Sequence, residues 1–103
     1  MKNDKIEIIQ INISGEDKPG LTSSLTGILA RHDAFILDIG QSNIHQSLTL
    51  GILFMTTAER SGQIMKELLF KASEMNIQIR FTPIDEEEYR RWVTGQGKNR
   101  YIL

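Results

Sequence analysis

Two spacings of apolar residues alternate along this chain, and their order is the feature that most limits its fold. Every-second-residue spacing, which is typical of strands, occurs at 6–13, 35–44, 48–54 and 77–82. Helical spacing occurs at 21–32 and 64–75. With right-handed crossovers, this order predicts an α+β, ferredoxin-like βαββαβ sandwich. Its four-stranded antiparallel sheet would carry two helices on one face.

Three details of these elements depend on single residues. The apolar phase of the first strand slips between Ile8 and Ile9, which indicates either a β-bulge or a strand buried on one face and half covered on the other. Thr57 or Ser61 is expected to cap the second helix. Pro83 has no N–H to donate, so the pairing of the fourth strand is expected to end there.

The character of the chain changes at residue 85. Four acidic residues at 85–88 precede Tyr89-Arg90-Arg91-Trp92, a pattern that predicts a short charged helix. Residues 94–98 have the composition of a flexible linker, and 100–103 resemble the start of another strand. We therefore expect one domain over residues 1–84, followed at 85–103 by a charged linker and the start of a further domain of a longer protein.

Composition argues against several classes of function. Lysine and arginine number 12 against 13 acids, so the formal charge of −1 gives no general attraction to nucleic acid or an anionic membrane. No apolar run approaches the ~20 residues of a membrane helix. The absence of cysteine excludes disulfides and thiolate sites, and it fits a cytoplasmic location. His32 and His45 have no acidic residue at ligand spacing, so no metal site is expected.

Catalysis by this chain is also unexpected, because it has no Walker loop, nucleophile elbow or aspartate-rich phosphotransfer motif. We assign no catalytic residue and no cofactor to it. An RNA-recognition module would need stacking aromatics on its first and third strands, where Phe54 is the sole aromatic. An acylphosphatase-like enzyme would need an arginine in the first loop, which offers only Lys18.

The loop from Gly15 to Leu21 is the best candidate site. A strand that turns directly into a helix leaves the first helical N–H groups free, and these attract a carboxylate or phosphate. Gly15 and Gly20 allow unusual torsions or a close approach, and Pro19 stiffens the turn. The same features also suit a solvated turn with no ligand.

Polar residues on the second strand favour the binding interpretation. Gln41 and Asn43 follow an apolar stretch of that strand. A small zwitterion needs acceptors for its ammonium group and N–H donors for its carboxylate. Asp17, Asn43 and a helix N-terminus would together supply both.

Two segments, 13–22 and 36–45, resemble ACT domains, and more narrowly the N-terminal ACT domains of bacterial phosphoserine phosphatases. The turn Asp17-Lys18-Pro19-Gly20-Leu21 matches the D-x-P-G-L pattern of ACT domains. The D-I-x-Q segment at 38–41, followed by the strand that begins at Leu48, is similar to the phosphatase branch. The resemblance covers about residues 5–84, and 97–103 resemble the lead-in to the next domain.

This resemblance implies a regulatory module that binds a small amino acid, L-serine, as a homodimer or paired with a second ACT domain. The ligand would lie between the first loop of one copy and the second strand of its neighbour. The implied contacts are Asp17, Lys18, Pro19, Gly20 and Leu21 from the loop, and Gln41 and Asn43 from the strand.

The resemblance also implies a cytoplasmic parent enzyme of serine biosynthesis. Its magnesium-dependent catalytic domain, of the haloacid-dehalogenase type, would lie beyond Leu103. The alternative is a purely structural dimerisation module, in which the same loop is only a turn and no ligand binds.

Overall fold

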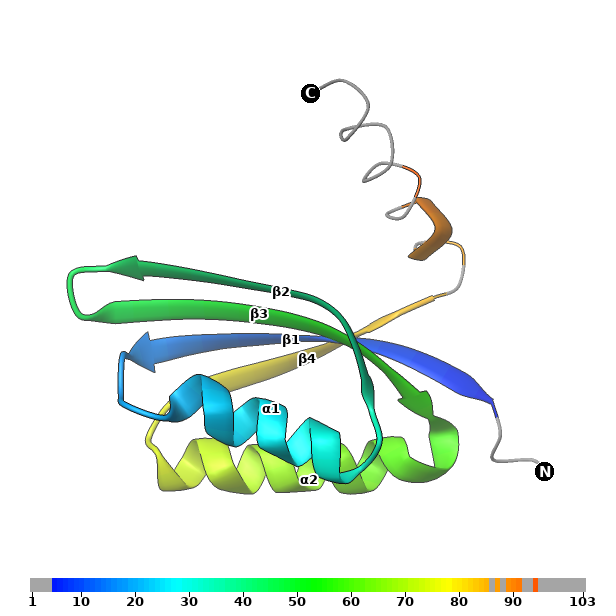
Figure 1. Cartoon of the computed structure of the whole chain (residues 1–103), viewed down its shortest axis with the longest axis horizontal. Helices are drawn as coiled ribbons and strands as arrows, with labels where there is room; N and C mark the ends of the chain where they lie inside the picture. Colours follow the sequence, from blue (N-terminus) through cyan, green and yellow to red (C-terminus); the bar gives the residue numbers. More distant parts are fainter. Residues whose placement is uncertain (1–4, 86, 88, 92–93, 95–103) are drawn as a thin grey trace.

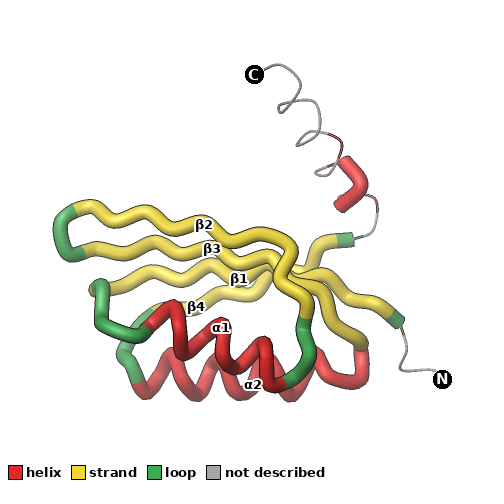
Figure 2. The backbone as a smooth tube through the Cα atoms, in the orientation of Figure 1, coloured by secondary structure: helices red, strands yellow, loops and turns green. Residues whose placement is uncertain are grey.

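One antiparallel sheet with the strand order β2-β3-β1-β4 carries both helices on a single face (Figures 1 and 2). The computed structural model describes residues 5–85, 87, 89–91 and 94. The strands are β1 (Ile6–Glu16), β2 (Phe35–Ile44), β3 (Ser47–Thr57) and β4 (Gln78–Ile84), and the helices are α1 (Leu21–Arg31) and α2 (Ala58–Glu74). The predicted βαββαβ sandwich is confirmed.

The core lies between the helices and the sheet face that they cover, which we call the inner face. β3 contributes Leu48, Leu50, Ile52 and Phe54, each at most 1% exposed. The buried residues of the helices are Leu21, Leu25, Ile28 and Leu29 on α1, and Ser61, Ile64, Leu68 and Ala72 on α2. These positions follow the predicted periodicities, and each large apolar side chain contributes about 1.5–3 kcal/mol when it is fully buried.

The phase slip in β1 is not a bulge. Ile8 faces Met55 and Ile9 faces Phe54 in a continuous register with β3. Both isoleucines are buried, so β1 is covered on both faces at this end. The second of the two alternatives therefore holds.

A bulge is present instead in β2, where the register shifts between Ile36 and Asp38 and leaves Leu37 without a partner. It changes which side chains of this strand meet the core. Ile36 packs against the core, whereas Phe35 is 64% exposed on the other side of the sheet. Simple alternation would put Phe35, Leu37 and Ile39 on one face, but the bulge places Phe35 and Ile39 on opposite faces.

The prediction that Pro83 ends the pairing of the fourth strand is wrong. Pro83 faces Ile9, and the pairing continues to Ile84. β4 is an edge strand that pairs only with β1, and proline is tolerated at an edge where its missing N–H would point away from the sheet.

Thr57 occupies the N-cap position of α2 but makes no side-chain capping bond. Ser61 lies inside the helix, where its hydroxyl donates to the carbonyl of Ala58 at 3.3 Å. The sequence therefore predicted the position of the cap at Thr57 correctly, but the expected side-chain capping bond is not made.

The short helix predicted after β4 agrees with the structure where residues are described. Residues 87, 89–91 and 94 are helical, and the Tyr89 amide donates to the carbonyl of Asp85 at 3.0 Å. Thr94 was expected to begin a linker, but it is helical and its hydroxyl bonds to the carbonyl of Arg90 at 3.0 Å. The linker at 95–98 and the strand at 100–103 lie outside the described residues.

Two glycine substitutions should change stability in opposite directions. A Cβ at Gly15 would lie 3.0 Å from Cγ2 of buried Ile77, whose β-branched side chain cannot easily move. We expect Gly15→Ala to lower the free energy of unfolding by about 1–3 kcal/mol in urea titrations. Gly27→Ala, on the exposed side of α1 with nothing within 4 Å, should raise it by about 0.5–1 kcal/mol. Equal stabilities for the two variants would contradict this account.

Candidate functional site

The loop between β1 and α1 turns sharply at Gly20, which has a φ of +79° and is the N-cap residue of α1. The Leu21 amide bonds back to the carbonyl of Lys18 at 3.2 Å, and the Leu21 side chain is buried in the core. Gly20 therefore has the unusual torsion that was predicted. Gly15 does not, since Gly20 is the only described glycine with a positive φ, and Gly15 instead allows β1 to approach Ile77.

Lys18 points away from the other candidate residues. Its ammonium group donates to the carbonyl oxygen of Met75, the residue that caps the C-terminus of α2. A cation there also interacts favourably with the negative end of the helix dipole. In this structure Lys18 therefore joins the loop to α2 and is not directed at a ligand.

Asp17, Gln41 and Asn43 do come together, and with Thr22 they form a hydrogen-bonded set that we call the polar network. The Asn43 amide donates to a carboxylate oxygen of Asp17 at 2.7 Å. The Gln41 amide donates to Oδ1 of Asn43 at 2.9 Å. The Thr22 hydroxyl then donates to Oε1 of Gln41 at 3.2 Å. These bonds connect the loop, β2 and the first turn of α1 within one chain.

A main-chain bond fixes the loop against the hairpin that carries β2. β2 and β3 are joined by a two-residue turn, His45 and Gln46, in which His45 has a φ of +57°. The Asp17 amide donates to the carbonyl of Gln46 at 2.9 Å. This bond holds the Asp17 carboxylate beside the end of β2, where Asn43 is located.

Donors for an anion lie beside the polar network. Among the described residues, the amides of Thr22 and Ser23 have no protein acceptor, and the first turn of α1 has no acidic residue. Such amides at the positive end of a helix favour a carboxylate or phosphate. Asp17 contributes a negative charge on the other side, so the arrangement can receive both ends of a small zwitterion.

Thr22 is the network member that the sequence interpretation missed, because helical spacing placed it only on the polar side of α1. Its position directly after the D-x-P-G-L turn was the available signal. Pro19 and Gly20 are exposed beside the network, and Leu21 can contribute no side-chain contact because it is in the core.

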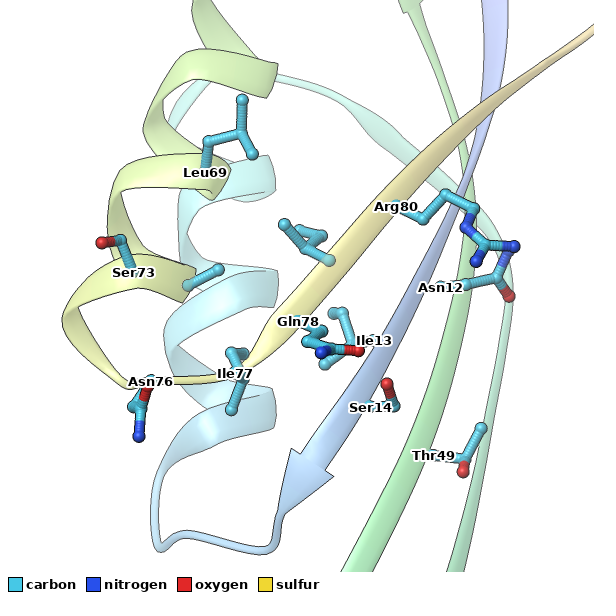
Figure 3. A pocket seen from close by; sticks show the side chains of 12 residues that line it. Asn12, Ile13, Ser14, Thr49, Leu69, Ser73, Asn76, Ile77, Gln78 and Arg80 are labelled. Carbon is cyan, nitrogen blue, oxygen red and sulfur yellow. The ribbon is translucent and has the colours of Figure 1, made fainter.

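A separate hollow lies away from these residues. It has a volume of about 710 Å³ and follows the outer edge of β4 near the C-terminal end of α2 (Figure 3). Leu69 and Ser73 border it on α2, while Asn12 and Arg80 lie on the far side of β4. None of the seven predicted site residues lines it. Because it wraps around a strand edge, it is an open trough and not an enclosed pocket.

The described part of the chain offers no cluster of metal ligands, since no three His, Asp or Glu side chains within it are grouped so that they could hold a metal ion. The same residues include no helix of the length and hydropathy needed to cross a membrane.

Known proteins agree with this architecture. Over 49 residues the chain is 41% identical to phosphoserine phosphatase SerB2 of Mycobacterium tuberculosis, a match that covers 48% of this chain and 12% of SerB2. An ACT domain protein from Streptococcus pneumoniae has a TM-score of 0.64 at 19% identity, covering 75% of this chain and 89% of that one. A formyltetrahydrofolate deformylase from Burkholderia mallei has a TM-score of 0.65 at 14% identity, covering 72% of this chain and 27% of that one.

The two structural matches have low sequence identity and so support the fold alone. The match to SerB2 covers only 12% of that protein, so it shows similarity over one short segment and not over the whole enzyme. The ACT domain family model matches residues 7–82, most of the chain. The chain therefore belongs to the ACT domain family.

Proposed function

We propose that this ACT domain binds a free amino acid, L-serine, at the polar network and the adjoining N-terminus of α1. The observation that carries the proposal is the 2.7 Å bond between Asp17 and Asn43, two residues 26 positions apart in the chain. It brings a carboxylate from the loop to amide groups on β2. The similarity of 49 residues to SerB2 favours serine over other amino acids.

The network has the groups that serine requires. The α-ammonium group would bind the Asp17 carboxylate, and the α-carboxylate would accept from the free amides of Thr22 and Ser23. The side chains of Gln41 and Asn43 offer both donors and acceptors to the serine hydroxyl. Asp17, Gln41 and Asn43 are exposed, so a ligand can reach them without opening the core.

A second ACT domain would cover the exposed side of this site. β2 is an edge strand, and it carries Ile39 and Ile44 with 44% and 68% exposure beside the network residues. An edge with exposed apolar side chains is suited to pairing with another chain. The partner would be a homodimer mate or a second ACT domain in the same protein.

The regulated enzyme would be a cytoplasmic phosphoserine phosphatase, with its catalytic domain and magnesium outside this chain. Serine would act by binding one arrangement of paired ACT domains more tightly than another. The coupling free energy of such effects is about 1–3 kcal/mol.

The alternative is a structural dimerisation module that binds no ligand. One observation favours it: the polar network already satisfies several of its own hydrogen bonds within the chain. In that case the network serves only to hold the loop against β2.

Calorimetric titration with L-serine distinguishes these functions. We expect heat of binding with the native chain, and at least about a tenfold weaker affinity with Asn43→Ala, because the bond that positions the Asp17 carboxylate and a contact to the serine hydroxyl are both lost. Ser42→Ala is the matched control, since Ser42 is the neighbouring residue on the opposite face of β2. Absence of binding at millimolar serine by the native chain would support the structural module instead.

Asp17→Ala should separate ligand binding from assembly. It removes the carboxylate that would bind the ammonium group, so serine should no longer raise the melting temperature, while sedimentation velocity should give an unchanged oligomeric state. Glu16→Ala, which changes an exposed acid beside the network, is the control and should keep the serine response. If both variants respond to serine as the native chain does, the Asp17 carboxylate is not part of the site.

A further inference from the structure

The face of the sheet that α1 and α2 leave uncovered, which we call the open face, contains two glycines side by side. Gly40 of β2 and Gly51 of β3 are direct cross-strand partners. Neither has a positive φ, so neither is needed for its backbone torsions. Glycine weakens a strand interior, and in sheets it often marks a place where another group approaches the backbone closely.

The glycine pair forms the floor of a hollow of about 430 Å³. A Cβ at Gly40 would meet nothing within 4 Å, and one at Gly51 would meet only Oδ1 of Asn12 at 3.9 Å and a main-chain oxygen at 4.0 Å. The space above both residues is therefore empty because the side chains are missing. Leu53 and Ile84 give the hollow an apolar wall, and Asp38 gives it a polar one.

An apolar row borders this hollow on the open face. Phe35 faces Met55, Met55 faces Ile8, and Ile8 faces Ile84, so the row crosses all four strands. Phe35 at one end is 64% exposed. An apolar row on the face that the helices leave open, next to glycines without side chains, favours an aromatic side chain, which buries a large area against both.

Tyr89 is an aromatic residue positioned to pack against this row and the two glycines. It lines the hollow from the segment that follows β4, and its amide bond to Asp85 sets it one helical turn beyond the end of the strand. It is also half-buried. Aromatic rings packed over strand glycines compensate for the missing side chains in β-sheets.

We propose that the hollow over Gly40 and Gly51 is a docking site for the Tyr89 ring, and that it holds the segment after β4 on the open face. The occupant comes from the same chain because Tyr89 already borders the hollow and the connection through Asp85 is short. This docking is independent of any ligand at the polar network, which lies on the inner face.

Filling the hollow without disturbing the fold tests the proposal. Gly51→Val places a side chain in the space over the pair, and valine is also favoured in strands, so the domain itself should not be destabilised. In the native chain, docking should protect the bonds after Arg90 and Arg91 from trypsin. We expect Gly51→Val and Tyr89→Ala to raise the rate of cleavage there by roughly tenfold, with Tyr89→Phe close to native.

Thr49→Val is the matched control, because Thr49 is on the same face of β3 but does not line this hollow. It should leave the cleavage rate unchanged. Trp92, the only tryptophan in the sequence, lies three residues after Tyr89 and gives a second readout. Its emission should move to longer wavelength in Gly51→Val and Tyr89→Ala, and not in Thr49→Val.

Two results would overturn the proposal. One is a trypsin cleavage rate and a Trp92 emission wavelength in Gly51→Val that equal those of Thr49→Val. That result would show that the hollow holds nothing from this segment. The other is a dependence of both readouts on protein concentration in the native chain. That result would assign the hollow to a second copy.

Discussion

The bulge at Leu37 determines which side chains of β2 reach the candidate site. Strict alternation from Ile36, which packs on the core, would put 38, 40, 42 and 44 on the inner face. Because Leu37 has no partner in β3, the phase changes, and Ile39, Gln41 and Asn43 face the same side as Ile36. Bulges change the direction of side chains beyond them in this way. If Leu37 instead paired with β3 in a regular ladder, the two amides of the polar network would lie on the open face.

The loop that meets those amides is held from two sides. Lys18 donates to the carbonyl of Met75 at the C-cap of α2, and the Asp17 amide donates to the carbonyl of Gln46 in the β2–β3 turn. A loop fixed at both ends loses little further conformational entropy when a ligand orders it, which favours binding by a small molecule with few contacts. The two glycines of this loop have separate roles: Gly20 supplies the left-handed torsion, and Gly15 the close approach to Ile77.

The sequence predicted the fold well because burial sets the period of each element. Leu48 to Phe54 alternate as a strand, and Ile64 to Ala72 repeat as a helix, so their buried faces followed from spacing alone. It did not predict the bulge at Leu37 or the pairing of Pro83, because both depend on which strands are neighbours. For the same reason it could not show that Lys18 reaches α2, or that Thr22 joins Gln41. Those contacts arise between residues distant in the sequence, and spacing carries no information about them.

β2 contributes residues to both the polar network and the hollow over Gly40 and Gly51. Gln41 and Asn43 project from its inner face into the polar network, while Asp38 and Gly40 line the hollow on its open face. As an edge strand, β2 pairs with β3 alone, and the polar network also bonds it to Asp17 and Thr22. Tyr89 lines the hollow beside Gly40, so the two sites share one strand but are formed by side chains on opposite faces of it, and each can be occupied without a rearrangement of the core.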